Sequence, residues 1–236
     1  MNDQEHKIKL INRKWKVRIV VVFFGAGLIL SAVLRYLDQN SQDPPQIAGF
    51  ATLIYVGITV IAAVILTRIG VPMHGLGFGF NFRPVSYLVL AAMGVGFIQL
   101  FGLMIDPLLE RFVGEPRNLE RFSDIAGSPI ALIKLLVLNW TLAAIGEELA
   151  FRIVLMRGIA FNLGDSRTAF GIALIAQAIL FGAIHAYQGP SGIISSGING
   201  LIFGGLTLAA RGSIWPAAIA HGASNTIGIL SLYLAA

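Results

Sequence analysis

The sequence predicts an all-α membrane protein, a polytopic helical bundle with about seven transmembrane helices and room for an eighth. Its composition is one reason, because 56% of the 236 residues are hydrophobic and only 12% are charged. An average soluble domain carries about 25% charged residues. The mean hydropathy of +0.78 is a second reason. The third is that long apolar runs recur along the whole length, unlike in a soluble domain with one anchor.

The chain is expected to form one membrane domain with three parts. They are a basic N-terminus at 1–16, N-terminal transmembrane helices and connectors at 17–128, and a transmembrane core at 129–236 that contains the candidate residues for chemistry. The first apolar run is too long for a signal peptide and is expected to stay as a helix. Residues 38–46 and 70–84 are expected to be connectors, and 108–128 an interfacial helix. The expected spans are 17–37, 47–69, 85–105, 129–163, 166–187, 192–210 and 214–236.

The span at 129–163 has a length that constrains its orientation. About 35 helical residues would reach roughly 50 Å, well beyond a hydrocarbon core about 30 Å thick. We therefore expect this helix to tilt strongly or to protrude. The turn Gly164-Asp165-Ser166 follows, and Ser166 is a suitable N-cap for the next helix.

The basic residues predict the topology. With seven spans the chain ends lie on opposite sides, and most of the 17 lysines and arginines then fall on the side of the N-terminus. Positive residues mark the cytoplasmic side, so the sequence predicts an integral protein of a bacterial cytoplasmic membrane with a cytoplasmic N-terminus. The same pattern explains the pI near 9.8 without a nucleic-acid partner. The absence of cysteine excludes disulfides, thiol catalysis and cysteine-based zinc sites.

Polar and ionisable residues inside the later spans are the candidates for chemistry. A charge at the centre of a bilayer costs roughly 2.5–3.5 kcal/mol, so adjacent carboxylates in an apolar helix need a reason. Taken singly, each candidate has a purely structural explanation: a packing histidine, an i,i+4 ion pair, or an asparagine that bridges two helices. Their concentration in the last part of the chain favours a common site. The candidates are Glu147, Glu148, Arg152, His185, His221 and Asn225.

Spacing assigns roles to these side chains. Glu148 shares a helix face with Arg152, which leaves Glu147 free to act as a general base. The turn at Gly164 places His185 at nearly the same depth as Glu147, so that the two could share a water molecule. His221 and Asn225 lie on one face and would suit a developing oxyanion. These parts predict water-mediated hydrolysis of an amide.

Three ordered motifs resemble those of a known family. They are Glu147-Glu148-x-x-x-Arg152, Phe181-x-x-x-His185 and His221-x-x-x-Asn225, each on an apolar helix. They resemble the CPBP family (CAAX proteases and bacteriocin-processing enzymes), whose best-known branch is the type II CAAX prenyl endopeptidase. The resemblance covers 129 to the C-terminus and implies an α-helical intramembrane endopeptidase. By that resemblance, Glu147 and His185 activate water, and His221 and Asn225 hold the oxyanion.

The resemblance implies a peptide or a lipidated protein as substrate, within the lipid bilayer. We expect no metal and no cofactor, although Glu147, His185 and His221 would form a His₂Glu zinc set in a metal-dependent alternative. Two other functions stay open: a proton-coupled transporter, and a non-catalytic scaffold or bacteriocin-immunity protein. A transporter would predict ionisable groups in both halves of the chain and often an internal repeat.

Overall fold

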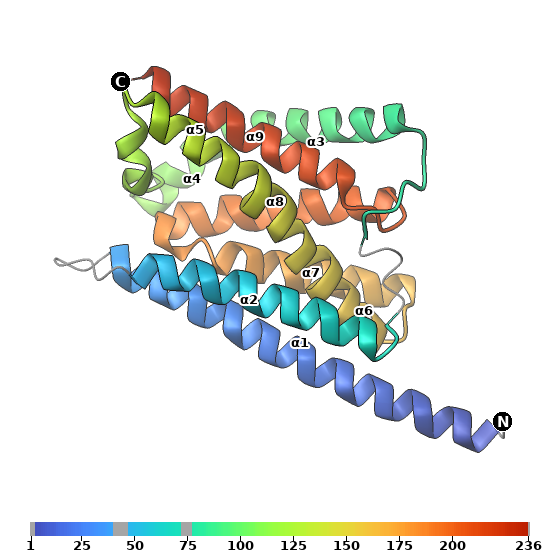
Figure 1. Ribbon diagram of the computed structural model, residues 1–236. Coiled ribbons are helices and arrows are strands. Elements are labelled where there is room, and N and C mark those ends of the chain that lie inside the picture. Colours follow the sequence, from blue (N-terminus) through green and yellow to red (C-terminus); the bar gives the residue numbers. More distant parts are fainter. Residues whose placement is uncertain (1–2, 40–46, 72–76, 236) are drawn as a thin grey trace.

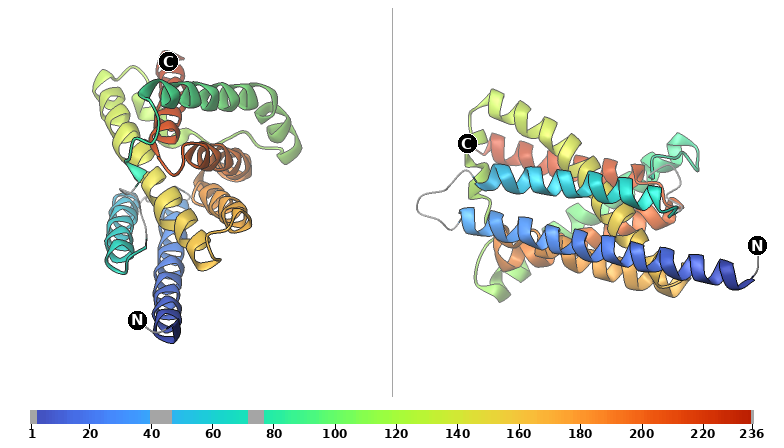
Figure 2. Two further views of the ribbon diagram at one scale, coloured as in Figure 1. Left: turned by 90° about the vertical axis from the view of Figure 1, so that its right-hand side faces the viewer. Right: turned by 60° about the horizontal axis from the view of Figure 1, so that its bottom comes forward.

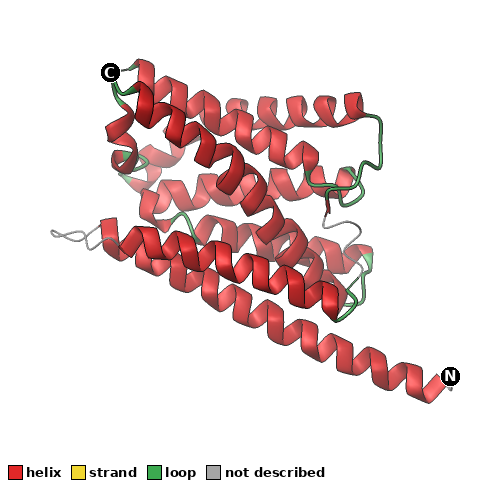
Figure 3. Ribbon diagram, in the orientation of Figure 1, coloured by secondary structure: helices red, strands yellow, loops and turns green. Residues whose placement is uncertain are grey.

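The computed structural model describes residues 3–39, 47–71 and 77–235. Every regular element in these ranges is a helix, and no strand occurs in them (Figure 3). The predicted all-α class is therefore confirmed. The first and last described residues lie at opposite ends of the bundle (Figure 1). Parts of the two expected connectors, 40–46 and 72–76, lie outside the described residues, as do residues 1 and 2 of the basic N-terminus.

The N-terminal half forms three long helices: α1 (Asp3–Gln39), α2 (Ile47–Arg68) and α3 (Pro84–Met104). Helix α1 includes most of the basic segment that the sequence analysis set apart from the first span. The reason is local, since residues 3–16 contain neither glycine nor proline and are rich in lysine and other residues compatible with a helix. Helices α1 and α2 pack against each other on one side of the bundle, and α3 packs against the last helix on the other (Figure 2).

The expected interfacial helix at 108–128 is wrong as a single element. The structure has a short helix α4 (Asp106–Val113) and a separate 3₁₀ helix η2 (Glu120–Ile125). Helix α4 ends at Gly114, whose φ of 84° is a left-handed conformation suited to glycine. Pro116 follows and prevents the helix from continuing.

The long span that begins at Pro129 is continuous but changes its winding. It starts as α5 (Pro129–Leu138), passes through two π-helical segments, η3 (Asn139–Glu147) and η4 (Leu149–Met156), and ends as α6 (Arg157–Asn162). The whole element crosses the bundle obliquely, as its length required (Figure 1). A π-helix is rare and usually no longer than one turn, and it is frequent at functional sites.

The remaining helices are α7 (Arg167–Ala183), the 3₁₀ turn η5 (Ala186–Gln188), α8 (Gly189–Ala209) and α9 (Trp215–Leu234). The Ser166 side chain accepts a hydrogen bond from the Ala169 N–H at 3.1 Å, so the predicted cap is confirmed. Helix α7 ends four residues before the expected limit at Tyr187, because the 3₁₀ turn interrupts it. Glycine lets α7 and α8 approach closely: a Cβ on Gly182 would lie 2.5 Å from the Ile193 carbonyl oxygen.

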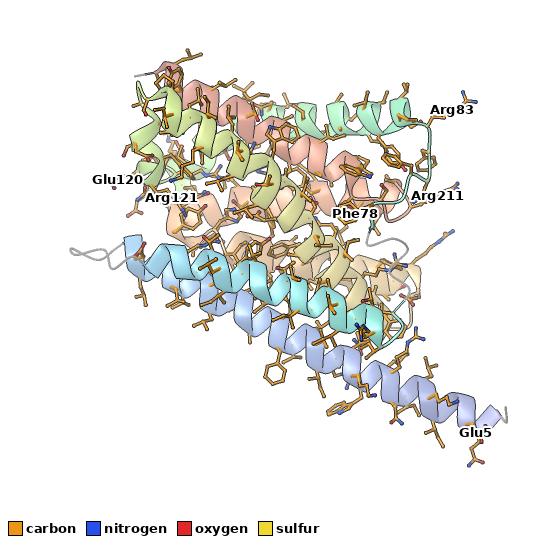
Figure 4. All side chains as sticks on the ribbon, viewed as in Figure 1. Glu5, Phe78, Arg83, Glu120, Arg121 and Arg211 are labelled. Atoms are coloured by element: carbon orange, nitrogen blue, oxygen red, sulfur yellow. The ribbon has the colours of Figure 1, made fainter. Side chains whose placement is uncertain are left out.

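Five helices in the described ranges are long and apolar enough to cross a membrane. They are 8–38, 51–68, 84–104, 129–162 and 186–209, and α7 is a shorter apolar helix. Many large apolar side chains on these helices face outward, including Phe23, Leu103 and Ile130. Such outward-facing apolar residues suit a lipid surrounding rather than water. Charged residues gather at the two ends of the bundle, with Arg83 and Arg211 at one end and Glu120 and Arg121 at the other (Figure 4).

Candidate active site

The π-helical part of the long span carries the paired carboxylates. Glu147 is the last residue of η3, Glu148 separates the two π segments, and Arg152 lies in η4. The Glu148 and Arg152 side chains are both 0% exposed, and Arg152 Nε lies 2.9 Å from Glu148 Oε2. The N–H of Arg152 does not point along this line, so the contact is an ion pair without a linear hydrogen bond. Arg152 Nη2 also donates to the Gly200 carbonyl at 3.3 Å. The predicted i,i+4 pair is thus present and fully buried.

His221 of α9 joins this pair from another helix. Its Nδ1 lies 3.0 Å from Glu148 Oε1. Because a carboxylate only accepts, Nδ1 carries the hydrogen and donates it. The ring is held on its face by Phe203, which stacks at 4.5 Å with an interplanar angle of 17°. Glu148 therefore fixes both the orientation and the tautomer of His221.

Glu147 is the more accessible of the two carboxylates. Its side chain is 12% exposed, against 0% for Glu148, and its Oε2 lies 4.0 Å from His221 Nε2. That oxygen is buried and has no hydrogen-bond partner among the described residues. Burying a polar atom without a partner costs free energy, and in a native protein it often marks a binding or catalytic atom. Glu147 thus has an acceptor oxygen that no described side chain or backbone group occupies.

His185 lies directly after α7, and its backbone and neighbours fix its ring. Its Nδ1 is 2.7 Å from the Phe181 carbonyl oxygen, so Nδ1 donates and Nε2 keeps a free lone pair. Phe181 lies 4.9 Å from the His185 ring and 5.9 Å from the His221 ring, measured between centroids. One phenyl ring thus contacts both imidazoles. No hydrogen bond joins His185 to Glu147 or His221 in the part of the chain that the structure describes.

The turn that follows His185 is held by the segment between α4 and η2. Arg117 Nε donates to Gln188 Oε1 at 2.7 Å, and the Gln188 carbonyl accepts from the Asn118 N–H at 3.0 Å. Burial lowers the pKa of the Arg117 guanidinium, because the charged form loses hydration. The guanidinium of Arg121 also lies 4.6 Å above the Tyr187 ring. These contacts make the position of His185 depend on a segment outside the transmembrane helices.

Asn225 lies apart from the other predicted site residues. It is one turn after His221 on α9, and its side chain is exposed. Within the described ranges it makes no hydrogen bond to the other five. The sequence analysis missed a buried asparagine that bonds to α9 from the long span: Asn139 Nδ2 donates to the Gly222 carbonyl at 2.9 Å. Its signal was a polar residue inside an apolar helix, the same signal that singled out Asn225.

The residues present do not fit a zinc ion in this arrangement. A His₂Glu site requires three donors about 2.0–2.2 Å from one point. Among the residues that the structure describes, no group of three His, Asp or Glu side chains could hold a metal ion. His221 Nδ1 donates a hydrogen bond to Glu148 and His185 Nδ1 to the Phe181 carbonyl, and the two Nε2 atoms have no common partner among the described residues. The contacts in this structure are those of a hydrogen-bonded network.

The fold and the site define a class of protein: a helical membrane protein with a buried carboxylate–histidine network in its bundle. Comparison with family models makes this specific. Residues 129–227 match the family described as type II CAAX prenyl endopeptidase Rce1-like. The matched segment runs from the first residue of α5 into α9 and includes all six predicted site residues, so the family expected from the three motifs is confirmed. Comparisons with curated proteins and with solved structures gave no significant match.

Proposed function

We propose that this protein is an intramembrane endopeptidase that hydrolyses a peptide bond with a water molecule activated by Glu147. The single observation that supports it best is the free carboxylate oxygen of Glu147, which lies 4.0 Å from His221 Nε2 in a bundle otherwise poor in buried charge. A general base must lie within reach of the water it deprotonates, and a buried acceptor without a partner meets that need. The family match supports a peptidase.

The roles of the other side chains follow from their bonds. His185 offers its free Nε2 to the same water, because its Nδ1 is committed to the Phe181 carbonyl. Glu148 and Arg152 support the site: the ion pair balances their buried charges, and Glu148 orients His221. His221, with Asn225, is proposed to bind the oxyanion, as the motif resemblance implies. The reaction needs no cofactor in this scheme.

The substrate we propose is a membrane-associated peptide with a C-terminal CAAX-type sequence, prenylated or not. The family description names prenyl endopeptidases, and a prenylated cysteine partitions into a bilayer together with the peptide. We place the protein in a bacterial cytoplasmic membrane with its N-terminus in the cytoplasm. Basic residues near that end of the bundle, including Arg83 and Arg211, support this orientation.

Cleavage by the purified protein tests the proposal. The wild type in detergent is incubated with an internally quenched peptide that ends in a farnesylated CAAX sequence, with the unprenylated peptide, and with a pool of unrelated peptides. Glu147→Ala serves as the paired variant. We expect cleavage of at least one probe by the wild type and none by the variant. Equal cleavage by both proteins would contradict the proposal. If the wild type cuts no probe, the scaffold or transporter alternatives are favoured.

A further inference from the structure

Tyr55 of α2 brings a hydroxyl group to the π-helical segment from outside the part of the chain that matches the family. The residue is only 4% exposed, and its hydroxyl is buried. The hydroxyl lies 3.9 Å from the position that a Cβ on Gly146 would occupy, and Gly146 precedes Glu147. It has no hydrogen-bond partner among the described residues. A buried hydroxyl usually finds a partner, so this one requires an explanation.

The charges around Tyr55 connect it to the proposed base. Arg35 of α1 lies over the Tyr55 ring, and Glu147 directly follows Gly146 in the chain. The Arg35 guanidinium lies 5.8 Å from the centre of the Tyr55 ring. Helices α1 and α2 thus place a positive charge and a hydrogen-bond donor beside the π-helical segment that carries Glu147.

Tyr55 and Glu147 are complementary but are not bonded to each other. The hydroxyl can donate, Glu147 Oε2 can accept, and both atoms are buried without a partner in the described part of the chain. Each such atom costs free energy unless it finds a hydrogen-bond partner. An attacked carbonyl group together with its attacking water supplies what they lack: a water proton for the carboxylate and a carbonyl oxygen for the hydroxyl.

We infer that the Tyr55 hydroxyl donates a hydrogen bond to the carbonyl oxygen of the scissile peptide bond and stabilises the oxyanion. Arg35 adds positive charge nearby. This inference rests on the proposed function. The water oxygen bonds to the carbonyl carbon while one water proton passes to Glu147. The π electrons of the carbonyl move onto its oxygen, which Tyr55 holds. When the C–N bond breaks, the carbonyl reforms and Glu147 returns its proton to the leaving amine.

A further donor would add to His221 and Asn225, the proposed oxyanion donors. His221 Nδ1 donates to Glu148, so its Nε2 can donate to an oxyanion only while the ring is protonated. Asn225 is exposed. An oxyanion in a low-dielectric site needs donors fixed before the reaction, and a tyrosine packed between helices has few conformations to lose. Tyr55 meets both requirements, and it lies outside 129–227.

Tyr55→Phe tests the inference, because it removes the hydroxyl oxygen and leaves the ring. Turnover of the farnesylated CAAX peptide should fall by roughly 10²–10³-fold with little change in KM, the usual effect of losing one oxyanion donor. The melting temperature in detergent should stay equal or rise, because an unpartnered buried group is removed. If the Tyr55 hydroxyl had only a structural role, Tyr55→Phe would instead lower the melting temperature and leave turnover per folded molecule unchanged.

Tyr87→Phe is the matched control. Tyr87 of α3 is also buried, at 2% exposed, but its hydroxyl accepts a hydrogen bond from the Phe82 N–H at 3.1 Å. This variant should melt at a lower temperature and keep the kcat of the wild type. Wild-type kcat in Tyr55→Phe would overturn the inference and leave the proposed function standing. If the wild type itself cuts no probe, the proposed function fails first, and Tyr55→Phe is then judged by its melting temperature, where a clear decrease counts against the inference.

Discussion

Glu148 Oε1 lies 3.0 Å from His221 Nδ1, so a carboxylate of the long helix fixes a histidine that is more than seventy residues away in the sequence. The other oxygen of the same carboxylate pairs with Arg152 at 2.9 Å. Glu148 is therefore engaged on both sides and is fully buried. It links the π-helical segment to α9, whereas its neighbour Glu147 keeps an unpartnered oxygen.

Replacing Glu148 by alanine should lower stability as well as activity. The Arg152 guanidinium would be left charged and unpaired in the bundle interior, which costs about 3–5 kcal/mol when one partner of a buried pair is removed. His221 would lose its orienting bond at the same time. Thermal unfolding in detergent measures the effect, and Glu120→Ala, at an exposed acidic residue, is the control. If Glu148→Ala and Arg152→Ala both melt like the wild type, the pair does not stabilise the fold.

Replacing Glu147 by glutamine should separate binding from chemistry. The amide keeps the size of the side chain but cannot take a proton from water. We expect substrate binding close to that of the wild type and a fall in turnover of about 10²-fold or more, the usual contribution of a positioned base. His185→Ala should give a similar loss. Single-turnover cleavage and peptide binding are the measurements.

Combining Glu147→Gln with His185→Ala tests whether the two residues act on the same water molecule. Two groups that activate one water act as a unit, so removing both should cost little more than removing either. A double variant that loses the full product of the two single effects would exclude a shared water. Wild-type cleavage by Glu147→Gln would exclude the base itself.

Chelation tests the metal-dependent alternative. We expect activity to survive prolonged treatment with a chelator, because the three candidate ligands do not converge on one point among the described residues. Residual activity is measured after dialysis, with and without added zinc. Loss of activity that stoichiometric zinc restores would assign Glu147, His185 and His221 as ligands in the active state.

The close approach of α7 and α8 gives a prediction about packing. A Cβ on Gly182 would lie 2.5 Å from the Ile193 carbonyl oxygen and 3.2 Å from Gly197 Cα, and backbone cannot yield as a side chain can. Gly182→Ala should therefore destabilise the protein by about 1–3 kcal/mol and displace His185, which lies just after the end of this helix. Gly171→Ala on α7 is the control, since nothing lies within 4 Å of its Cβ position. A normal melting temperature for Gly182→Ala would show that the two helices can separate at little cost.

The features that were predictable from the sequence are local ones. Apolar runs of sufficient length located the spans, the hydroxyl of Ser166 before an apolar run located a helix start, and i,i+4 spacing located the pair of Glu148 and Arg152. Each depends on residues within a few positions of one another. The break after α4 was also local, since Gly114 and Pro116 are visible in the sequence, and the single interfacial helix expected there overlooked both residues.

The features that escaped prediction depend on contacts between distant helices. No sequence period indicated the π-helical winding. The bond between Glu148 and His221, and the place of Tyr55 beside Gly146, arise only when α2 and α9 pack against the long helix. The catalytic roles of the six predicted residues stay a prediction. The structure brings Glu147, Glu148, Arg152 and His221 together, lets Phe181 connect His185 to them, and leaves Asn225 exposed.

The π-helical winding of residues 139–147 and 149–156 makes this element extensible. A π turn contains more residues than an α turn and so advances less per residue along the axis. Rewinding either segment to α geometry would lengthen the element and rotate Glu147 about the axis, while Ser128 still caps its start and Gly164 still ends it. Each residue would exchange one backbone hydrogen bond for another, while the buried contacts of Glu148 with Arg152 and His221 oppose the rotation. A shift in winding would change both the reach of the Glu147 carboxylate and the direction in which it points.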